Sequence, residues 1–153
     1  MSEASEASAL LSATTLIAFR LNGQFLEVAE GLARPVGLTA AWWQVLGAIV
    51  HDPLPVAGIA RAMGMTRQGV QRIADLLVEK GLAEYRPNPA HRRAKLLRLT
   101  PDGRAAIGQI APGHQSLADR LVAELGPAAT RESLETLQRL SAALERLSGP
   151  PRT

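Results

Sequence analysis

The chain has 153 residues, of which 46% are hydrophobic and 20% charged, a balance that excludes a disordered tail and fits one compact domain with extensions. It contains no cysteine, which excludes disulfide bonds, thiol redox chemistry and zinc sites with cysteine ligands. The net charge of +3 is unevenly distributed, because residues 61–104 carry ten Lys/Arg against four Asp/Glu. This basic middle segment indicates either a polyanion-binding surface or a solvated basic face.

The first predicted element is a long amphipathic helix that ends between Gly31 and Pro35. Its apolar face follows a three-then-four spacing at Leu10, Thr14, Ile17, Leu21, Phe25, Val28 and Leu32. The acidic residues 1–8 lack the basic-then-apolar order of a signal peptide, and no run of eighteen apolar residues occurs. We therefore expect a cytoplasmic protein that does not bind a membrane.

A second helix is predicted after Thr39, a suitable N-cap, and before Pro53. It carries two consecutive tryptophans, Trp42 and Trp43, on its apolar side. Core packing is the simpler interpretation of both rings. The alternative is that Trp42 lines a cavity for a small molecule, since aromatic side chains commonly line such sites.

Two short helices joined by a tight turn follow. The first spans residues 55–63, with Pro55 in its first turn, and Gly64 ends it in a left-handed conformation. Thr66 caps the second, which runs to Lys80. Its inward residues are predicted to be Val70, Ile73, Ala74 and Leu77, and its outward residues Gln68, Gln71, Arg72, Asp75 and Glu79.

The periodicity then changes to that of strands. Residues 82–85 and 95–99 are predicted strands, and the turn-forming, basic segment 87–93 joins them into a hairpin. Thr100 is expected to cap a further helix, which Pro112 interrupts or kinks. A last helix carries an apolar stripe of Leu134, Leu137, Leu140, Leu144 and Leu147. In so short a chain, this stripe favours packing between two copies.

Helix, turn, helix and basic hairpin, in this order, are typical of a winged helix-turn-helix. The second helix presents arginine and glutamine near its N-terminus, which suits the major groove of DNA: arginine can donate two hydrogen bonds to guanine, and glutamine can bracket adenine. The hairpin tip carries Arg92 and Arg93, and arginines held in this way suit a narrow minor groove.

Residues 59–72 and 81–104 resemble the helix-turn-helix, wing strands and following helix of the MarR family, and the flanking helices have counterparts as well. The resemblance implies a mainly α fold with a small β-hairpin wing. It also implies an N-terminal dimerisation helix (1–35), a winged helix-turn-helix domain (36–104) and C-terminal dimerisation helices (105–153).

The resemblance further implies a sequence-specific DNA-binding transcriptional regulator, a repressor that a small-molecule ligand releases. Its partners would be a palindromic double-stranded operator, a second copy of the chain and a small aromatic ligand. The expected DNA contacts are Thr66, Arg67, Gln68, Gln71, Arg72, Arg86, His91, Arg92, Arg93 and Lys95. The candidate ligand contacts are Trp42 and Trp43.

One departure from the family concerns the wing, which in relatives carries Asp, any residue and then Arg. His91 occupies the aspartate position here, so the minor-groove role carries over to Arg93 but the steadying ion pair does not. This substitution predicts either a looser wing or DNA binding that depends on pH.

Two other classes of protein are compatible with parts of this pattern. One is a winged-helix protein-interaction module that does not bind DNA, which the exposed arginines oppose. The other is a small enzyme, but no nucleophile elbow or phosphate-binding loop occurs. His51, His91 and His114 lack metal-ligand spacing. We therefore expect neither catalysis, nor a metal, nor a cofactor.

Overall fold

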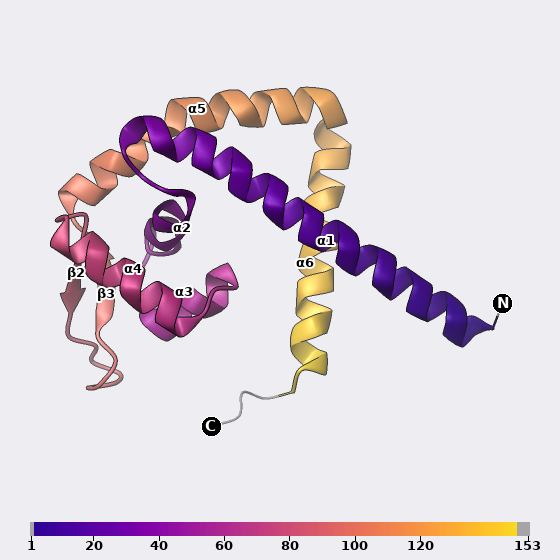
Figure 1. Ribbon diagram of the computed structural model, residues 1–153, viewed down its shortest axis with the longest axis horizontal. Coiled ribbons are helices and arrows are strands. Elements are labelled where there is room, and N and C mark those ends of the chain that lie inside the picture. The colour runs from indigo at the N-terminus through magenta and orange to yellow at the C-terminus, as the bar shows by residue number, and fades with distance from the viewer. Residues whose placement is uncertain (1, 150–153) are drawn as a thin grey trace. The chain divides into compact units, whose positions relative to one another are not determined.

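The computed structural model describes residues 2–149, which form two compact units, one up to Ala111 and one from Pro112 onward (Figure 1). The helices are α1 (Glu3–Ala33), α2 (Ala40–Ala48), α3 (Val56–Met63), α4 (Arg67–Glu79), α5 (Pro101–Leu125) and α6 (Pro127–Leu147). The strands are β1 (Leu54–Pro55), β2 (Ala83–Arg86) and β3 (Leu96–Leu99), and a 3-10 turn covers Arg34–Val36. The predicted class, mainly α with a small β-wing, is confirmed. No helix in the described part of the chain has the length and apolar character needed to cross a bilayer.

Three threonines begin helices, as the sequence predicts. Thr39 Oγ1 accepts a hydrogen bond from the backbone N–H of Trp42 at 3.1 Å, and Thr66 Oγ1 accepts one from Gly69 at 3.0 Å. Thr100 Oγ1 accepts a third from Gly103 at 3.1 Å. Each bond satisfies a backbone donor that the first turn of a helix leaves without an intrahelical partner.

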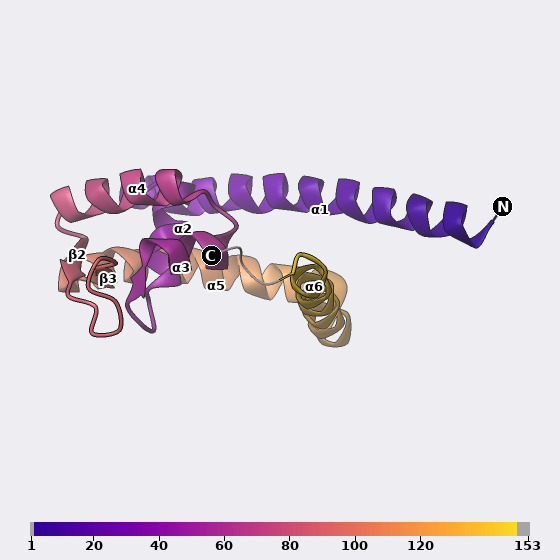
Figure 2. The same ribbon diagram turned by 90° about the horizontal axis from the view of Figure 1, so that it is seen from below.

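The turn between α3 and α4 depends on Gly64, whose φ of 63° lies in the left-handed region that favours glycine. After this turn, α4 packs its apolar face into the core: Val70, Ala74 and Leu77 are fully buried and Ile73 nearly so. They pack with Val45, Leu46, Ile59 and Leu97 in one cluster. The other face of α4 is consequently exposed to solvent. The loop between β2 and β3 projects from the same unit (Figure 2).

The sheet has three antiparallel strands in the order β1-β3-β2. The sequence predicted only the hairpin formed by β2 and β3. The additional strand is β1, in which Leu54 pairs with Leu97 and Pro55 with Leu96. Pro55 is therefore extended and is the N-cap of α3. The sequence had predicted that Pro55 lies in the first turn of this helix. The hairpin strands begin one residue later than predicted, at Ala83 and Leu96.

Pro112 does not interrupt its helix, because α5 is continuous from Pro101 to Leu125. The backbone φ of proline is compatible with a helix, and the loss is one hydrogen bond and some crowding of the preceding turn.

The beginning of α5 is hydrogen-bonded to the segment that follows α4, and it packs against that segment. The backbone N–H of Thr100 donates a hydrogen bond to the carbonyl oxygen of Leu82 at 3.2 Å. The Thr100 hydroxyl donates a second one to the carbonyl oxygen of Gly81 at 2.6 Å. Gly103 packs so closely here that a Cβ atom would lie 1.9 Å from the Leu82 carbonyl oxygen. These contacts hold the start of β2, and with it the wing, in a defined position beside α4.

Candidate nucleic-acid interface

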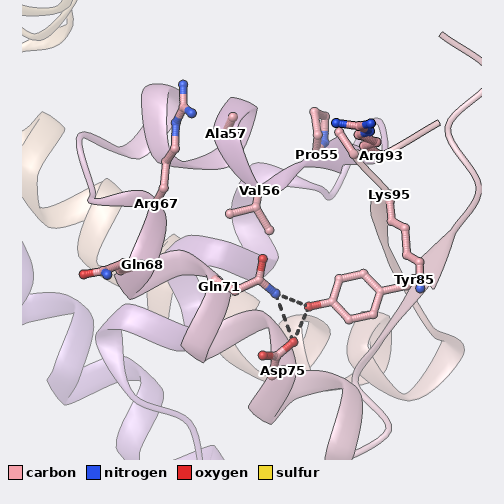
Figure 3. A pocket seen from close by; sticks show the side chains of 11 residues that line it. Pro55, Val56, Ala57, Arg67, Gln68, Gln71, Asp75, Tyr85, Arg93 and Lys95 are labelled. Carbon is pink, nitrogen blue, oxygen red and sulfur yellow. Dashed lines mark hydrogen bonds between the residues drawn. The ribbon is translucent and has the colours of Figure 1, made fainter. Parts of the chain in front are cut away.

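A groove of about 610 Å³ lies between α3, α4 and the wing. Five predicted DNA contacts line it: Arg67, Gln68, Gln71, Arg93 and Lys95. Arg67 lies on one side, Arg93 and Lys95 lie on the other, and Gln71 and Tyr85 lie between (Figure 3). The fold thus brings together side chains from two separate segments. Among the ionisable residues of the lining, three are basic and only Asp75 is acidic.

Within the groove, Gln71, Asp75 and Tyr85 form a closed ring of hydrogen bonds, which we call the Gln71–Asp75–Tyr85 triad (Figure 3). The Tyr85 hydroxyl donates to Asp75 Oδ1 at 2.6 Å. Gln71 Nε2 donates to the same Oδ1 at 3.0 Å and to the Tyr85 hydroxyl at 2.9 Å. Because Gln71 and Asp75 lie on α4 and Tyr85 on β2, the triad ties the helix to the wing.

The triad changes the acidity of Tyr85. Burial, and then the hydrogen bond to Asp75 and its negative charge, raise the pKa of Tyr85 to about 12. The phenol is therefore protonated at neutral pH and remains a donor to Asp75. Lys95 Nζ lies 5.9 Å from the centre of the Tyr85 ring, a cation–π contact that holds this lysine at the groove.

Arg86 lies outside the groove lining, although the sequence suggested a DNA contact. Its Nη2 donates to Glu84 Oε1 at 3.1 Å, and Arg98, paired with Glu84 across the ladder, donates to the same oxygen. The hydrogen bond from Arg98 and the charge of Arg86 lower the pKa of Glu84. Since side chains alternate along a strand, Glu84 and Arg86 lie on the sheet face opposite Tyr85.

Asn88 organises the tip of the wing. Its Oδ1 accepts a hydrogen bond from the backbone N–H of Ala90 at 3.0 Å, and its carbonyl accepts one from His91 at 3.2 Å. The carbonyl of His91 in turn accepts from Ala94 at 3.3 Å. These bonds form a compact turn in which an Asn side chain completes the backbone hydrogen bonding. They order the loop without the aspartate that His91 replaces, and they leave Arg92 and Arg93 exposed.

The other residues predicted to contact DNA or a ligand lie outside the groove. Thr66 caps α4, and Arg72 is exposed on α4 outside the groove lining. Trp42 and Trp43 are half-buried on α2 and pack against the core. Lys80 Nζ, just after α4, lies 5.3 Å from the centre of the Trp42 ring.

Three residues of this surface have no functional role predicted from the sequence: Asp75, Tyr85 and Asn88. Asp75 was recognised as an outward residue of α4, and it lies one helical turn after Gln71, where their side chains can meet. That spacing was a usable signal. Tyr85 lies fourteen residues beyond Gln71, and only the packing of β2 on α4 brings the two together.

A helix, a glycine turn, a second helix with an exposed polar face, and a basic hairpin define a winged helix-turn-helix protein. A family model described as the MarR family matches residues 36–94. An uncharacterised protein of Mycobacterium tuberculosis is 40% identical over 127 residues, or 83% of this chain and 89% of that protein. The multiple antibiotic resistance protein MarR of Salmonella typhimurium is 31% identical over 107 residues, 69% and 72% of the two chains. The chain belongs to the MarR family of winged-helix transcription regulators.

Solved structures share this fold. The regulator BldR of Sulfolobus solfataricus aligns with a TM-score of 0.75 at 21% identity, over 94% of this chain and 99% of that one. A MarR mutant of E. coli, complexed with operator DNA, gives a TM-score of 0.71 at 24% identity, over 86% and 95%. BpsR of Bordetella bronchiseptica, a protein whose DNA binding is regulated by 6-hydroxynicotinic acid, gives a TM-score of 0.71 at 23% identity, over 84% of this chain and 98% of that one.

Tyr85 is the only tyrosine of the chain, so the ultraviolet absorbance of phenolate reports the triad directly. The wild type should ionise with a midpoint of about 12, and Asp75→Ala should lower that midpoint toward the ordinary 10.0 without reaching it, because burial persists. Since the pKa is raised in the folded state, the stabilisation by this phenol is complete below about pH 10 and is lost as the pH rises through about 12.

Asp119→Ala is the matched control, because Gln115 donates to Asp119 at 2.8 Å in the same i,i+4 arrangement and neither residue takes part in the triad. It should leave the midpoint unchanged. Circular dichroism at each pH checks that the chain is folded. Equal midpoints for the wild type and Asp75→Ala would show that Asp75 does not hold the phenol.

Proposed function

We propose that this protein is a transcriptional repressor that binds a palindromic operator as a homodimer. Binding of a small aromatic ligand releases the repressor from the operator. The observation that carries the proposal is the basic groove, in which Arg67 from α4 lies across from Arg93 and Lys95 of the wing. A surface with these charges on both sides complements the phosphate backbone of DNA.

In this proposal the first turns of α4 enter the major groove, where Arg67 and Gln68 reach base edges. Arg93 enters the neighbouring minor groove, while Arg92 and Lys95 contact phosphates. The exposure of Arg67, Gln68 and Arg93 supports these roles, as does the fold shared with the E. coli MarR mutant that is bound to operator DNA.

The homodimer is supported by apolar side chains that this chain exposes. They are Leu10, Leu11, Leu16, Ile17, Phe19, Phe25 and Val28 on α1, and Leu134, Leu137, Leu144 and Leu147 on α6. Large apolar side chains exposed along two helices favour burial against a second copy, because removing apolar surface from water is favourable. We assign dimerisation to residues 1–35 and 105–153 and DNA binding to residues 36–104. Two-fold symmetry would then present two α4 helices about one turn of DNA, roughly 10–10.5 base pairs, apart.

The ligand is proposed to bind at Trp42 and Trp43. An aromatic acid stacked on Trp42 would compete for the ring face over which Lys80 lies, and Lys80 directly follows α4. Binding would thus favour an arrangement in which the two α4 helices no longer match the operator spacing. The regulation of BpsR by 6-hydroxynicotinic acid supports a ligand of this class.

The DNA-binding surface is tested with sites selected from a random duplex pool. Arg92→Ala should weaken binding about equally on selected and random DNA and should flatten the log–log salt dependence by about one unit. Arg93→Ala should weaken binding most on sites with a narrow minor groove, such as A-tracts.

Arg98→Ala is the matched control, since it removes an arginine from the same hairpin but from the opposite sheet face, and it should change affinity far less. Failure of the wild type to enrich any sequence, together with equal binding by all three variants, would contradict the proposed function.

The dimer is tested by sedimentation at micromolar concentration, where the wild type should have twice the mass of the 16.3 kDa chain. Leu137→Arg would place an unpaired charge in the apolar contact and should shift the population to monomer. Glu135→Arg introduces the same side chain on the opposite face of α6 and should stay dimeric. Circular dichroism separates dissociation from unfolding, and a monomeric wild type would rule out the dimer.

A further inference from the structure

We propose that Asp75 and Tyr85 set the base preference of the protein by holding Gln71 as a pure hydrogen-bond acceptor, so that it selects an amino base, adenine or cytosine, at one position of each half-site. This inference rests on the proposed function, because it assigns a specificity to the same groove. Asp75 and Tyr85 are positioning residues here, and Gln71 is the residue that meets the base.

The donors of the triad are fully used. A glutamine amide has two N–H donors and one carbonyl acceptor, and a phenol has one O–H donor. Gln71 Nε2 donates to Asp75 Oδ1 and to the Tyr85 hydroxyl, and that hydroxyl donates its single proton to Asp75. No amide hydrogen of Gln71 is left for a base.

The orientation of the amide is fixed by chemistry as well as by distance. Rotating the amide by half a turn would bring its carbonyl oxygen against the Asp75 carboxylate, where two acceptors would repel each other. The observed orientation places the nitrogen toward Asp75 and Tyr85 and directs the oxygen away from them, into the groove (Figure 3). Releasing the donor on Asp75 would require breaking a hydrogen bond to a carboxylate, which is among the stronger kinds, and releasing the other donor would require breaking the hydrogen bond to the Tyr85 hydroxyl.

The consequence for DNA follows from the major-groove edges of the bases. Adenine N6 and cytosine N4 are donors that can meet the Gln71 oxygen, whereas guanine and thymine present acceptors at the corresponding places. A free glutamine would instead bracket adenine alone, accepting from N6 and donating to N7. The triad therefore predicts tolerance of both adenine and cytosine at this position.

Tyr85→Phe tests the inference with little change of shape, since it removes only the hydroxyl and releases one amide hydrogen of Gln71. Full-length wild type, Tyr85→Phe and Gln71→Ala are each used to select sites from a random duplex pool. Affinities are then measured on four duplexes that differ only at the position where Gln71→Ala loses its preference.

The wild type should bind the adenine and cytosine duplexes about equally, and roughly tenfold more tightly than the guanine and thymine duplexes, as expected for one hydrogen bond. Tyr85→Phe should favour adenine over cytosine by a similar factor. Asp75→Ala removes the other acceptor of the Gln71 amide, and it should likewise favour adenine over cytosine. A role of Tyr85 in stability alone would not move the ratio between two duplexes.

The inference is overturned if the wild type already prefers adenine as strongly as Tyr85→Phe does, or if Gln71→Ala changes no position of the selected site. In both cases the proteins still bind DNA, so the proposed function stands. If the wild type selects no sequence at all, the proposed function and this inference fail together.

Discussion

The burial of one face of α4 is the constraint on which the rest of the structure depends. Val70, Ala74 and Leu77 are withdrawn completely from solvent, and each buried side chain of the larger kind stabilises the fold by about 1.5–3 kcal/mol. Turning the helix about its axis would expose these side chains and bury Gln71 and Arg67. The same burial that stabilises the domain therefore selects the polar side chains that face the groove.

A second level of structure places the wing beside that face. The contacts of Thr100 with Gly81 and Leu82 fix the chain after α4, and the triad joins β2 to the helix itself. As a result, Arg67 and Arg93 face one groove although they lie far apart in the sequence. The electrostatic and the geometric requirements of a DNA-binding surface are met by the same contacts that assemble the domain.

Local signals made most of the fold predictable. Threonine caps, the left-handed Gly64 and the helical spacing of apolar residues each act within a few residues, and all are found where the sequence placed them. Strand β1 could not be predicted, because two residues ending in Pro55 have no periodicity and pair only through β3. The phase of α4 likewise predicted that Gln68 and Gln71 face outward, and both are exposed. The pairing of Arg98 with Glu84 across the ladder and the bond between Gln71 and Tyr85 depend on strand register and packing, which no local pattern encodes.

In the proposed complex, the exposed face of α4 meets the major groove of DNA while the wing meets the minor groove. Interference by dimethyl sulfate on a selected site tests it most directly, because this reagent methylates guanine N7 in the major groove and adenine N3 in the minor groove. We expect interference at guanine N7 in two half-sites about 10–10.5 base pairs apart, with interference at adenine N3 beside each. Interference at adenine N3 alone, or at neither atom, would contradict it.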